Sequence, residues 1–132
     1  MTLQRVNPPT LARPSGFSHA VVADSGRVVF LAGQVALGPD GAIVGDTVAE
    51  QFERALGNLL EALRAAGGSP AGLASLTVYA VDLDDYRAQA REIGLAWRRL
   101  VGLQYPAMAA IGVARLWDPA ALVEIQGYAV IG

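Results

Sequence analysis

The stretch that decides the fold is YPAMAAIGVARLWDPAALVEIQGYAVIG, from Tyr105 to Gly132. It predicts two strands, at about Ala107 to Ala114 and Leu122 to Val130, joined as a hairpin by a turn around Trp117-Asp118-Pro119. Side chains of the second strand alternate between two faces. Glu124, Gln126 and Tyr128 point one way, and Val123, Ile125, Gly127 and Ala129 point the other. The chain therefore ends in β-structure with one polar and one apolar face.

The N-terminal part of the chain predicts a second hairpin behind an irregular arm. Met1 to Gly16 is rich in proline and polar residues, which is typical of irregular backbone. Phe17 to Ala23 and Arg27 to Ala32 have strand character, and the turn signal Asp24-Ser25-Gly26 stands between them. We expect these two strands to pair, and Ala42 to Val44 to add a brief third strand.

The first predicted helix runs from about Val48 to Ala66. Thr47 is a good N-cap, and Glu50 three residues later completes the pattern of a capping box. Apolar side chains recur at helical spacing along the segment, which predicts one buried stripe. Gly67-Gly68 provides the left-handed turn that ends the helix.

A strand and a second helix complete the predicted elements. Leu73 to Val81 is rich in branched and aromatic residues, and Asp82 to Asp85 cap a helix from about Asp85 to Val101. The apolar stripe of this helix consists of Tyr86, Ala90, Ile93, Trp97 and Leu100. The order ββ(β)αβαββ predicts an α+β fold, with two helices on one face of a mixed sheet and residues 1–132 in a single domain.

The composition excludes several kinds of site. The 132 residues include no cysteine, no lysine and one histidine, His19. Thiolate chemistry, a lysine Schiff base and a two-histidine metal site are therefore excluded, and we expect no cofactor. His19 is more readily explained as a surface or core residue than as a residue lining a site.

Charge and hydropathy limit the partners. The net charge is -2 and the arginines are scattered, so no basic stripe is available to bind nucleic acid. No apolar run is long enough to span a bilayer, and the N-terminus lacks the apolar core of a signal peptide. We therefore expect a cytoplasmic protein with no nucleic-acid or membrane partner.

Short blocks along the chain resemble the RidA/YjgF family of reactive-intermediate deaminases. These blocks include Gly33-Gln34, Glu50-Gln51, Thr77-Val78-Tyr79, Val113-Ala114-Arg115-Leu116 and Val123-Glu124-Ile125. The resemblance covers nearly the whole chain. It implies a chorismate-mutase-like fold, a homotrimer, and small-molecule ligands bound in clefts between subunits. Some members are described as endoribonucleases, an activity that the scattered arginines do not favour.

The resemblance also implies a set of site residues. Glu124 matches the glutamate thought to position or activate the attacking water, although a structural role or a pair with Arg115 is an equal alternative from the sequence. Pro106-Ala107-Met108 stands where the family has Pro-Ala-Arg, whose arginine binds the substrate carboxylate. Arg115 matches a second family arginine, for which we expect a structural role.

Further departures from the family point in the same direction as Met108. Phe17 and Ala32 stand where the family has residues with hydroxyl groups, whereas Gly33, whose backbone can approach a ligand, is kept. The predicted ligand-binding residues are therefore Phe17, Ala32, Gly33, Ala107 and Met108, with Glu124 as the catalytic residue. A thioether cannot replace the two parallel hydrogen bonds of an arginine.

Two functions follow from these residues. The first is hydrolysis of an enamine or imine that is less polar than the family's usual substrate. The activity on 2-aminoacrylate-type substrates is expected to be weak or lost because Met108 replaces the arginine. The alternative is a non-catalytic trimeric scaffold that binds a metabolite or a protein partner.

Overall fold

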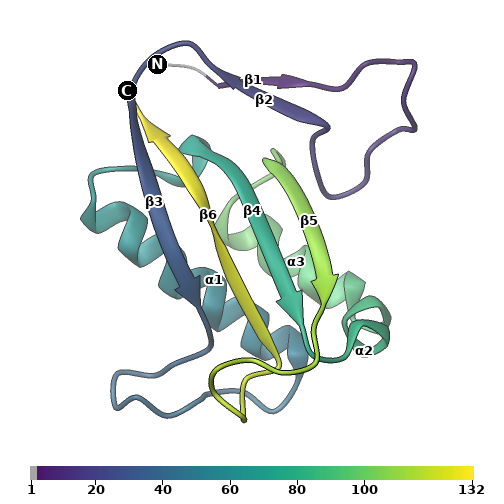
Figure 1. The fold of residues 1–132 in the computed structure, drawn as a ribbon, viewed down its shortest axis with the longest axis vertical. Helices are drawn as coiled ribbons and strands as arrows, with labels where there is room; N and C mark the ends of the chain where they lie inside the picture. The colour runs from purple at the N-terminus through teal and green to yellow at the C-terminus, as the bar shows by residue number, and fades with distance from the viewer. Residues whose placement is uncertain (1–2) are drawn as a thin grey trace.

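The structure of the chain, a computed structural model, describes residues 3–132. Its centre is a four-stranded mixed sheet in the order β3-β6-β4-β5 (Figure 1). The strands are β3 (Arg27–Gln34), β4 (Leu73–Ala80), β5 (Ala107–Gly112) and β6 (Val123–Ile131). β6 lies inside the sheet and is antiparallel to both neighbours, whereas β5 runs parallel to β4 along one edge.

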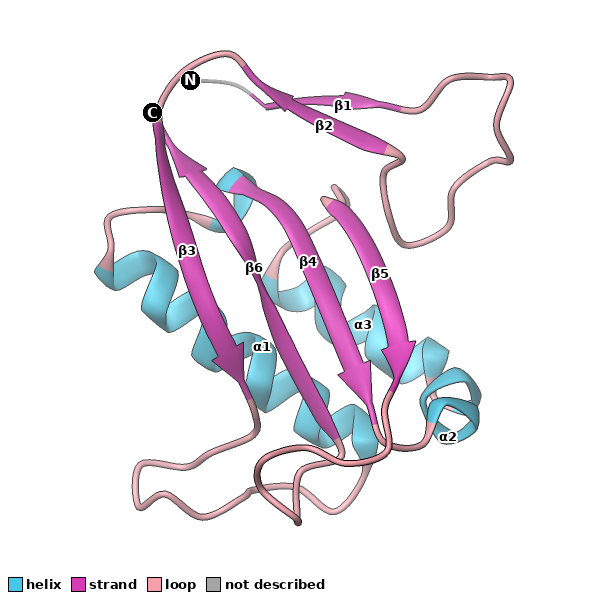
Figure 2. Ribbon diagram, in the orientation of Figure 1, coloured by secondary structure: helices cyan, strands magenta, loops and turns pink. Residues whose placement is uncertain are grey.

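The helices cover one face of this sheet (Figure 2). They are α1 (Val48–Ala65), the six-residue α2 (Leu83–Ala88) and α3 (Ala90–Leu100), and a short 3₁₀ turn at Pro70–Gly72 precedes β4. The predicted α+β fold, with helices on one face of a mixed sheet, is confirmed. The core lies between the two layers, where the leucine stripe of α1 packs on β6 and β3. Its fully buried residues include Leu56, Leu59, Leu60, Leu63, Leu76, Val78, Val123 and Ile125.

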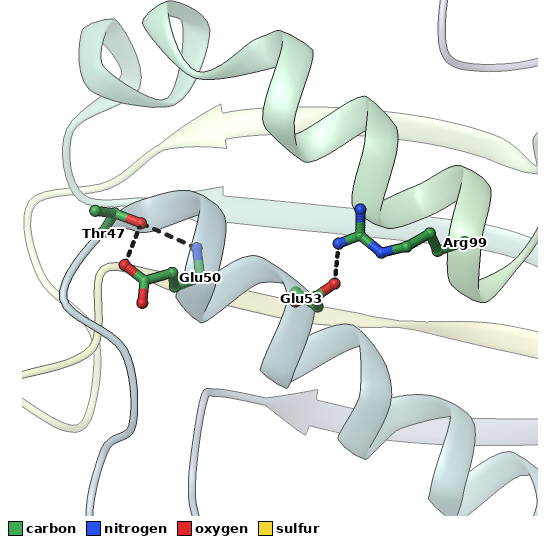
Figure 3. Close-up of polar contacts among 4 residues, drawn as sticks. All are labelled: Thr47, Glu50, Glu53 and Arg99. Atoms are coloured by element: carbon green, nitrogen blue, oxygen red, sulfur yellow. Dashed lines mark hydrogen bonds and ion pairs between the residues drawn. The ribbon is translucent and has the colours of Figure 1, made fainter.

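The predicted start and end of α1 are also confirmed. The Thr47 hydroxyl accepts a hydrogen bond from the Glu50 backbone N–H at 3.1 Å and donates to the Glu50 carboxylate at 3.0 Å (Figure 3). These bonds satisfy one of the N–H groups that a helix leaves free at its first turn. Gly67 has a φ of +95°, the left-handed conformation expected after the helix.

The N-terminal hairpin was predicted with the wrong partner. β2 (Ala20–Ala23) pairs with β1 (Leu3–Val6) in a separate two-stranded ribbon, not with β3. The arm predicted to be irregular therefore contributes a strand. The turn signal at Asp24-Ser25-Gly26 is real, and Gly26 has a φ of +109°, but the chain leaves this turn towards the main sheet. A turn signal in the sequence does not indicate whether the strands on its two sides pair with each other.

The predicted pairing of the two C-terminal strands is also wrong, for a related reason. β4 lies between β5 and β6, so the two closing strands do not pair with each other. β5 instead pairs with β4, and Met108 lies beside Leu76 in that register. The connection from 113 to 122 crosses the end of β4, which a tight hairpin turn would not need to do. The alternation predicted for β6 is nevertheless confirmed, because Val123, Ile125 and Ala129 are buried and Tyr128 is exposed.

Two smaller predictions also need correction. Ala42 to Val44 forms no strand, and only an isolated bridge joins Leu37 to Ile43. The second helix is broken at Gln89, which belongs to neither α2 nor α3. The Gln89 amide nitrogen donates to Asp85, and its amide oxygen accepts from the backbone N–H of Ala49 in α1. These two bonds stabilise the bend, and no glycine or proline marks it in the sequence.

The second face of the main sheet carries no helix. Phe30 of β3 and Tyr128 of β6 lie side by side on it with ring centroids 5.4 Å apart, and Phe30 is 77% exposed. Val28 and Ile111 are also exposed. We call this surface the open face. No helix in the described part of the chain is long and apolar enough to cross a membrane.

Candidate functional site

A cavity of about 380 Å³ lies between β5, the helices α2 and α3, and the arm before β2. Its lining is aromatic, aliphatic or small, with Ser15 as the one aliphatic hydroxyl. The residues are Ser15, Gly16, Phe17, Phe52, Val78, Tyr86, Ala90, Ile93, Gly94, Trp97, Tyr105, Met108, Ala109 and Ala110. Ala90, Ala109 and Ala110 are exposed, so the cavity reaches the surface beside the edge strand. No lining residue carries a charge, which favours an apolar ligand.

Three elements position the side chains of the cavity. Alternation along β5 directs Met108 towards the helix layer, where it packs on the core. The arm is held beside β5 because Ser18 donates twice, from its backbone N–H to Pro106 at 2.9 Å and from its hydroxyl to Tyr105 at 2.6 Å. Phe17 is thereby kept at the cavity. Small residues on α3, Ala90 and Gly94, leave the space open.

Several of the side chains that line the cavity are aromatic rings. Trp97 and Tyr105 stack with centroids 5.5 Å apart and an interplanar angle of 12°. The Trp97 indole N–H donates to the Gln104 carbonyl at 3.3 Å, which orients the ring. Tyr86 meets Phe52 edge to face, and burial raises the pKa of the Tyr86 phenol to about 12. Tyr86 is therefore a neutral phenol at physiological pH.

Glu124 lies on the open face, away from this cavity. It is half-buried, and in the register of β4 and β6 it stands beside Tyr79. Gly33 on β3 packs against the other side of the carboxylate, since a Cβ added at Gly33 would meet Glu124 Oε2 at 2.5 Å. The missing side chain of Gly33 therefore provides the room that the Glu124 carboxylate occupies.

The predicted site residues fall into two groups within one chain. Phe17 and Met108 line the cavity, whereas Gly33 and Glu124 meet on the open face. Leu76, which pairs with Met108, is buried under the helices. Tyr79, which pairs with Glu124, lies three residues further along β4, so its side chain points to the other face of the sheet. Met108 and Glu124 consequently project from opposite faces of the sheet. One chain alone does not bring them together.

Ala107 and Ala32 belong with the second group. Ala107 pairs with Ser75 and so shares the parity of Tyr79 on the open face. Ala32 is exposed and precedes Gly33 near the end of β3. Neither side chain provides a polar contact. Both remain predicted ligand-binding residues through their position alone.

Sequence reasoning missed several residues of the cavity. It assigned Tyr86 and Trp97 to the apolar stripe of a helix, and it gave Tyr105 no role. A stripe at helical spacing indicates which side chains face the sheet, but it does not indicate where packing is incomplete. The small residues Ala90 and Gly94, one turn apart and opposite Met108, are the signal that could have located the gap.

Two alternative roles considered for site residues can also be compared with the structure. The one ion pair among residues 3–132 joins Arg99 of α3 to Glu53 of α1 (Figure 3), so Arg115 does not pair with Glu124. His19 uses its ring Nε2 to contact the Ala12 carbonyl at 2.7 Å, and its backbone N–H donates to Asn7. His19 therefore ties the arm together outside the cavity.

The described residues contain no group of three or more histidines, aspartates or glutamates that could hold a metal ion. Glu124 has Tyr79 and Gly33 as neighbours, and neither is a carboxylate or an imidazole. The arrangement instead offers a carboxylate on one face and an uncharged cavity on the other. A carboxylate can act as a general base, and an uncharged cavity can hold an apolar group.

Known proteins resemble this chain over nearly its full length. A family model described as "Endoribonuclease L-PSP" matches residues 10–131. The human 2-iminobutanoate/2-iminopropanoate deaminase is 31% identical over 117 residues, which cover 88% of this chain and 80% of that protein. A RutC family protein from Pyrococcus abyssi is 33% identical over 119 residues, covering 89% and 88% of the two chains.

Solved structures are also similar to this chain over nearly its full length. The crystal structure of YyfB from Yersinia pestis, a Rid family protein of unknown function, matches with a TM-score of 0.89 and 37% identity, covering 99% of this chain and 100% of that one. The E. coli protein TdcF, solved with bound serine, matches with a TM-score of 0.71 and 28% identity over 91% of each chain.

Proposed function

This chain belongs to the RidA/YjgF family and has its chorismate-mutase-like fold, and on that premise we propose that it binds and hydrolyses an imine or enamine that lacks a carboxylate. The observation that carries the proposal is the position of Met108 in a cavity of about 380 Å³ with no charged lining residue. The human relative is named as a deaminase of two imino acids, whose carboxylates need a cation. Met108 provides none, and the cavity favours an apolar substituent instead.

The chemistry requires water, a base and a proton for the departing nitrogen. Water adds to the imine carbon while Glu124 accepts one of its protons. Glu124 returns this proton to the nitrogen, which gives a neutral carbinolamine. As the C–N bond then breaks, Glu124 takes the proton of the carbinolamine hydroxyl and passes it to the nitrogen, which leaves as ammonia. An imine and one water thus become a carbonyl compound and one ammonia, with no external oxidant or reductant.

This proposal requires more than one copy of the chain. Met108 and Glu124 project from opposite faces of the sheet, so a substrate that touches both must lie between two copies. The open face, with its exposed Phe30 and Tyr128, is the surface that a neighbouring copy would cover. We propose a trimer with a cleft at each subunit boundary.

The sharpest test compares two ligands of the same shape, benzamide and benzoate, by the shift they cause in thermal unfolding. We expect benzamide to stabilise the protein and benzoate to have little effect. Met108→Arg should reverse this order, because the loss or gain of a charged anchor is worth about 3–5 kcal/mol. Equal shifts from both ligands in both proteins would rule out recognition at Met108.

Activity is tested with imines generated in the assay. A flavin amine oxidase acting on benzylamine supplies an imine without a carboxylate, and an amino-acid oxidase supplies one with a carboxylate. The protein should accelerate ammonia release from the first imine more than from the second. Glu124→Gln should abolish the acceleration while retaining benzamide binding. No acceleration over buffer with either imine would reject hydrolysis.

The separation of Met108 from Glu124 within one chain favours a second candidate, a non-catalytic binding protein. In that case the cavity alone recognises the ligand. Benzamide binding would then be unaffected by Glu124→Gln, and neither protein would release ammonia. The pair of experiments therefore separates the two functions.

A further inference from the structure

A second cavity, of about 170 Å³, lies at the end of the main sheet where β4 and β5 begin. The two-stranded ribbon of β1 and β2 crosses this end of the sheet (Figure 1), and β1 contributes Arg5 to the lining. The other lining residues come from the 3₁₀ turn, the first residue of β4 and the segment between α3 and β5. Among residues 3–132, none lines both this second cavity and the one that contains Met108.

Arg5 places a guanidinium at this second cavity with few partners of its own. Its Nη2 donates to the Ala71 carbonyl at 3.4 Å, which is longer than an ordinary N–H···O bond. Its Nε is the one buried side-chain nitrogen or oxygen among residues 3–132 that has no hydrogen-bond partner. No aspartate or glutamate in that part of the chain lines the cavity. A buried donor of a charged group is costly when it is unpaired, so this position favours a ligand that accepts hydrogen bonds.

Most of the remaining lining is apolar and small. It consists of Pro70, Leu73, Val101, Leu103 and Pro106, which we call the apolar wall. Leu103 is 73% exposed, so one side of the wall faces solvent. The two prolines fix their backbone angles, which helps to keep the cavity open before a ligand binds. Its volume equals that of about six water molecules. The second cavity therefore combines a guanidinium with an apolar slot of limited size.

We propose that the second cavity binds a short aliphatic carboxylate of about six non-hydrogen atoms, such as isobutyrate. The Arg5 guanidinium would donate two parallel hydrogen bonds to the carboxylate, and the alkyl group would pack on the apolar wall and cover Leu103. Because one long bond holds the guanidinium in place, the flexible Arg5 side chain can turn and bring Nε to an acceptor in the cavity. The site is separate from the one that contains Met108 and does not depend on imine hydrolysis.

An aliphatic carboxylate fits this lining better than other small ligands. Inorganic phosphate would pair with Arg5 but would place its charged oxygens against the apolar wall, which is unfavourable. An uncharged amide of the same shape has one acceptor oxygen and no charge, so it would lose the stronger, charge-assisted bonds. Acetate would pair with Arg5 and leave most of the apolar wall in water. The ligand therefore needs both the carboxylate and the alkyl group.

The orphan Nε–H of Arg5 can be followed directly by NMR. All ten basic residues of the chain are arginines, so a protein labelled with nitrogen-15 gives side-chain Nε–H signals from arginine alone. Arg5→Lys identifies the Arg5 signal by its loss. Titration with isobutyrate at constant ionic strength should shift this signal, and isobutyramide should leave it in place. We expect isobutyrate to bind about tenfold more tightly than isobutyramide or more, and also more tightly than acetate or phosphate.

Variants separate the two halves of the second cavity. Arg5→Gln should weaken isobutyrate binding about tenfold or more, as measured by the shift in thermal unfolding, whereas Arg13→Gln removes the same charge from an exposed position of the arm and should retain binding. Leu103→Ser should weaken isobutyrate binding and leave acetate binding unchanged. If Arg5→Gln does not fold, Arg5→Lys keeps the charge without the planar fork and should also bind isobutyrate more weakly.

Three results would overturn the proposal: an Arg5 signal that isobutyrate does not shift, equal binding of isobutyrate and isobutyramide, or phosphate binding as tight as that of isobutyrate. The last result would mean that Arg5 attracts any anion. The proposed function is judged separately, by repeating the comparison of benzamide with benzoate in Arg5→Gln. That variant should respond to both ligands as the natural protein does, and a protein without imine hydrolysis should still bind isobutyrate.

Discussion

The side chain of Gln51 connects helix α1 to two other segments of the chain by hydrogen bonds. It is 3% exposed, and its amide nitrogen donates to the carbonyls of Gly45 and Ala120 while its oxygen accepts from the Leu122 N–H. One side chain at the start of α1 thus joins the loop before that helix to the connection that leads into β6. Glu124 follows two residues after Leu122, so this bond also fixes where the candidate base begins its strand.

Replacing Gln51 by leucine should destabilise the protein by about 2–4 kcal/mol. The change leaves one buried N–H and two carbonyls without their partner, and each unsatisfied group costs about 1–3 kcal/mol before relaxation. Urea unfolding followed by circular dichroism measures the effect. Glu61→Leu, at an exposed position of the same helix, serves as the control and should change stability by less than about 0.5 kcal/mol. Equal effects from the two variants would contradict a role for the buried bonds.

Tyr86 should make stability depend on pH in the alkaline range. Burial raises its pKa from 10.0 to about 12, so the folded protein keeps a proton that the unfolded chain releases. The contribution is complete below pH 10 and is lost as the pH rises towards 12. Its size is up to about 3 kcal/mol, from two pKa units. Urea unfolding across this range should show a loss that Tyr86→Phe reduces; an unchanged loss would refute the assignment.

At the residue scale, the sequence does not show which side chains surround a predicted site residue. Met108 was expected at the ligand site, and it lines the cavity. The aromatic neighbours of Met108 come from the arm, α2, α3 and the segment before β5, so no single stretch of sequence displays them together. The family-like block Glu50-Gln51 did not indicate a buried role for Gln51, because its partners Ala120 and Leu122 are more than sixty residues away along the chain.

At the scale of the elements, signals within one turn of helix predicted the structure correctly, whereas the predicted strand partners were wrong. The start of α1 was predicted because Thr47 and Glu50 interact within one turn. The partners of β2, β3, β5 and β6 were not, since pairing depends on segments far apart in sequence. Each predicted hairpin joined two consecutive strands, which is a common arrangement. In both cases another strand supplied the real neighbour.

Two glycines should respond differently to alanine. At Gly127 in β6 a Cβ would lie 2.0 Å from the Ser75 carbonyl oxygen, a backbone atom held in the sheet. At Gly33 it would meet the far end of the Glu124 side chain, which can move aside. We expect Gly127→Ala to cost more than about 2 kcal/mol or to prevent folding, and Gly33→Ala to cost less than about 1 kcal/mol.

Urea unfolding measures both glycine variants, and the imine assay provides a second readout for Gly33→Ala. That variant should lose ammonia release while keeping its stability, because it displaces the Glu124 carboxylate. A Gly127→Ala protein as stable as the natural one would mean that β4 and β6 are less closely packed than described.

At the scale of the whole molecule, the open face exposes apolar side chains that no helix of the described chain covers. Phe30 remains 77% and Tyr128 41% exposed although their rings meet edge to face. Phe30→Asp should therefore shift the protein to smaller species in sedimentation without lowering the stability of the monomer. Leu95→Asp, on the outer side of the helix layer, is the control and should leave association unchanged. Dissociation by both variants, or by neither, would argue against association through the open face.

The position of β6 has a consequence for synthesis of the chain. Of the four strands in the main sheet, β6 is synthesised last, yet β3 and β4 both take it as their neighbour, and Arg27 pairs with Ile131. Helix α1 can form as soon as it is synthesised, but the main sheet cannot close until the residues of β6 are available. Pairing across such a separation is slow, because the loop between the partners must first be ordered. A growing chain consequently carries β3 and β4 with exposed edges, and a chain that stops before Val123 lacks the strand on which the whole sheet depends.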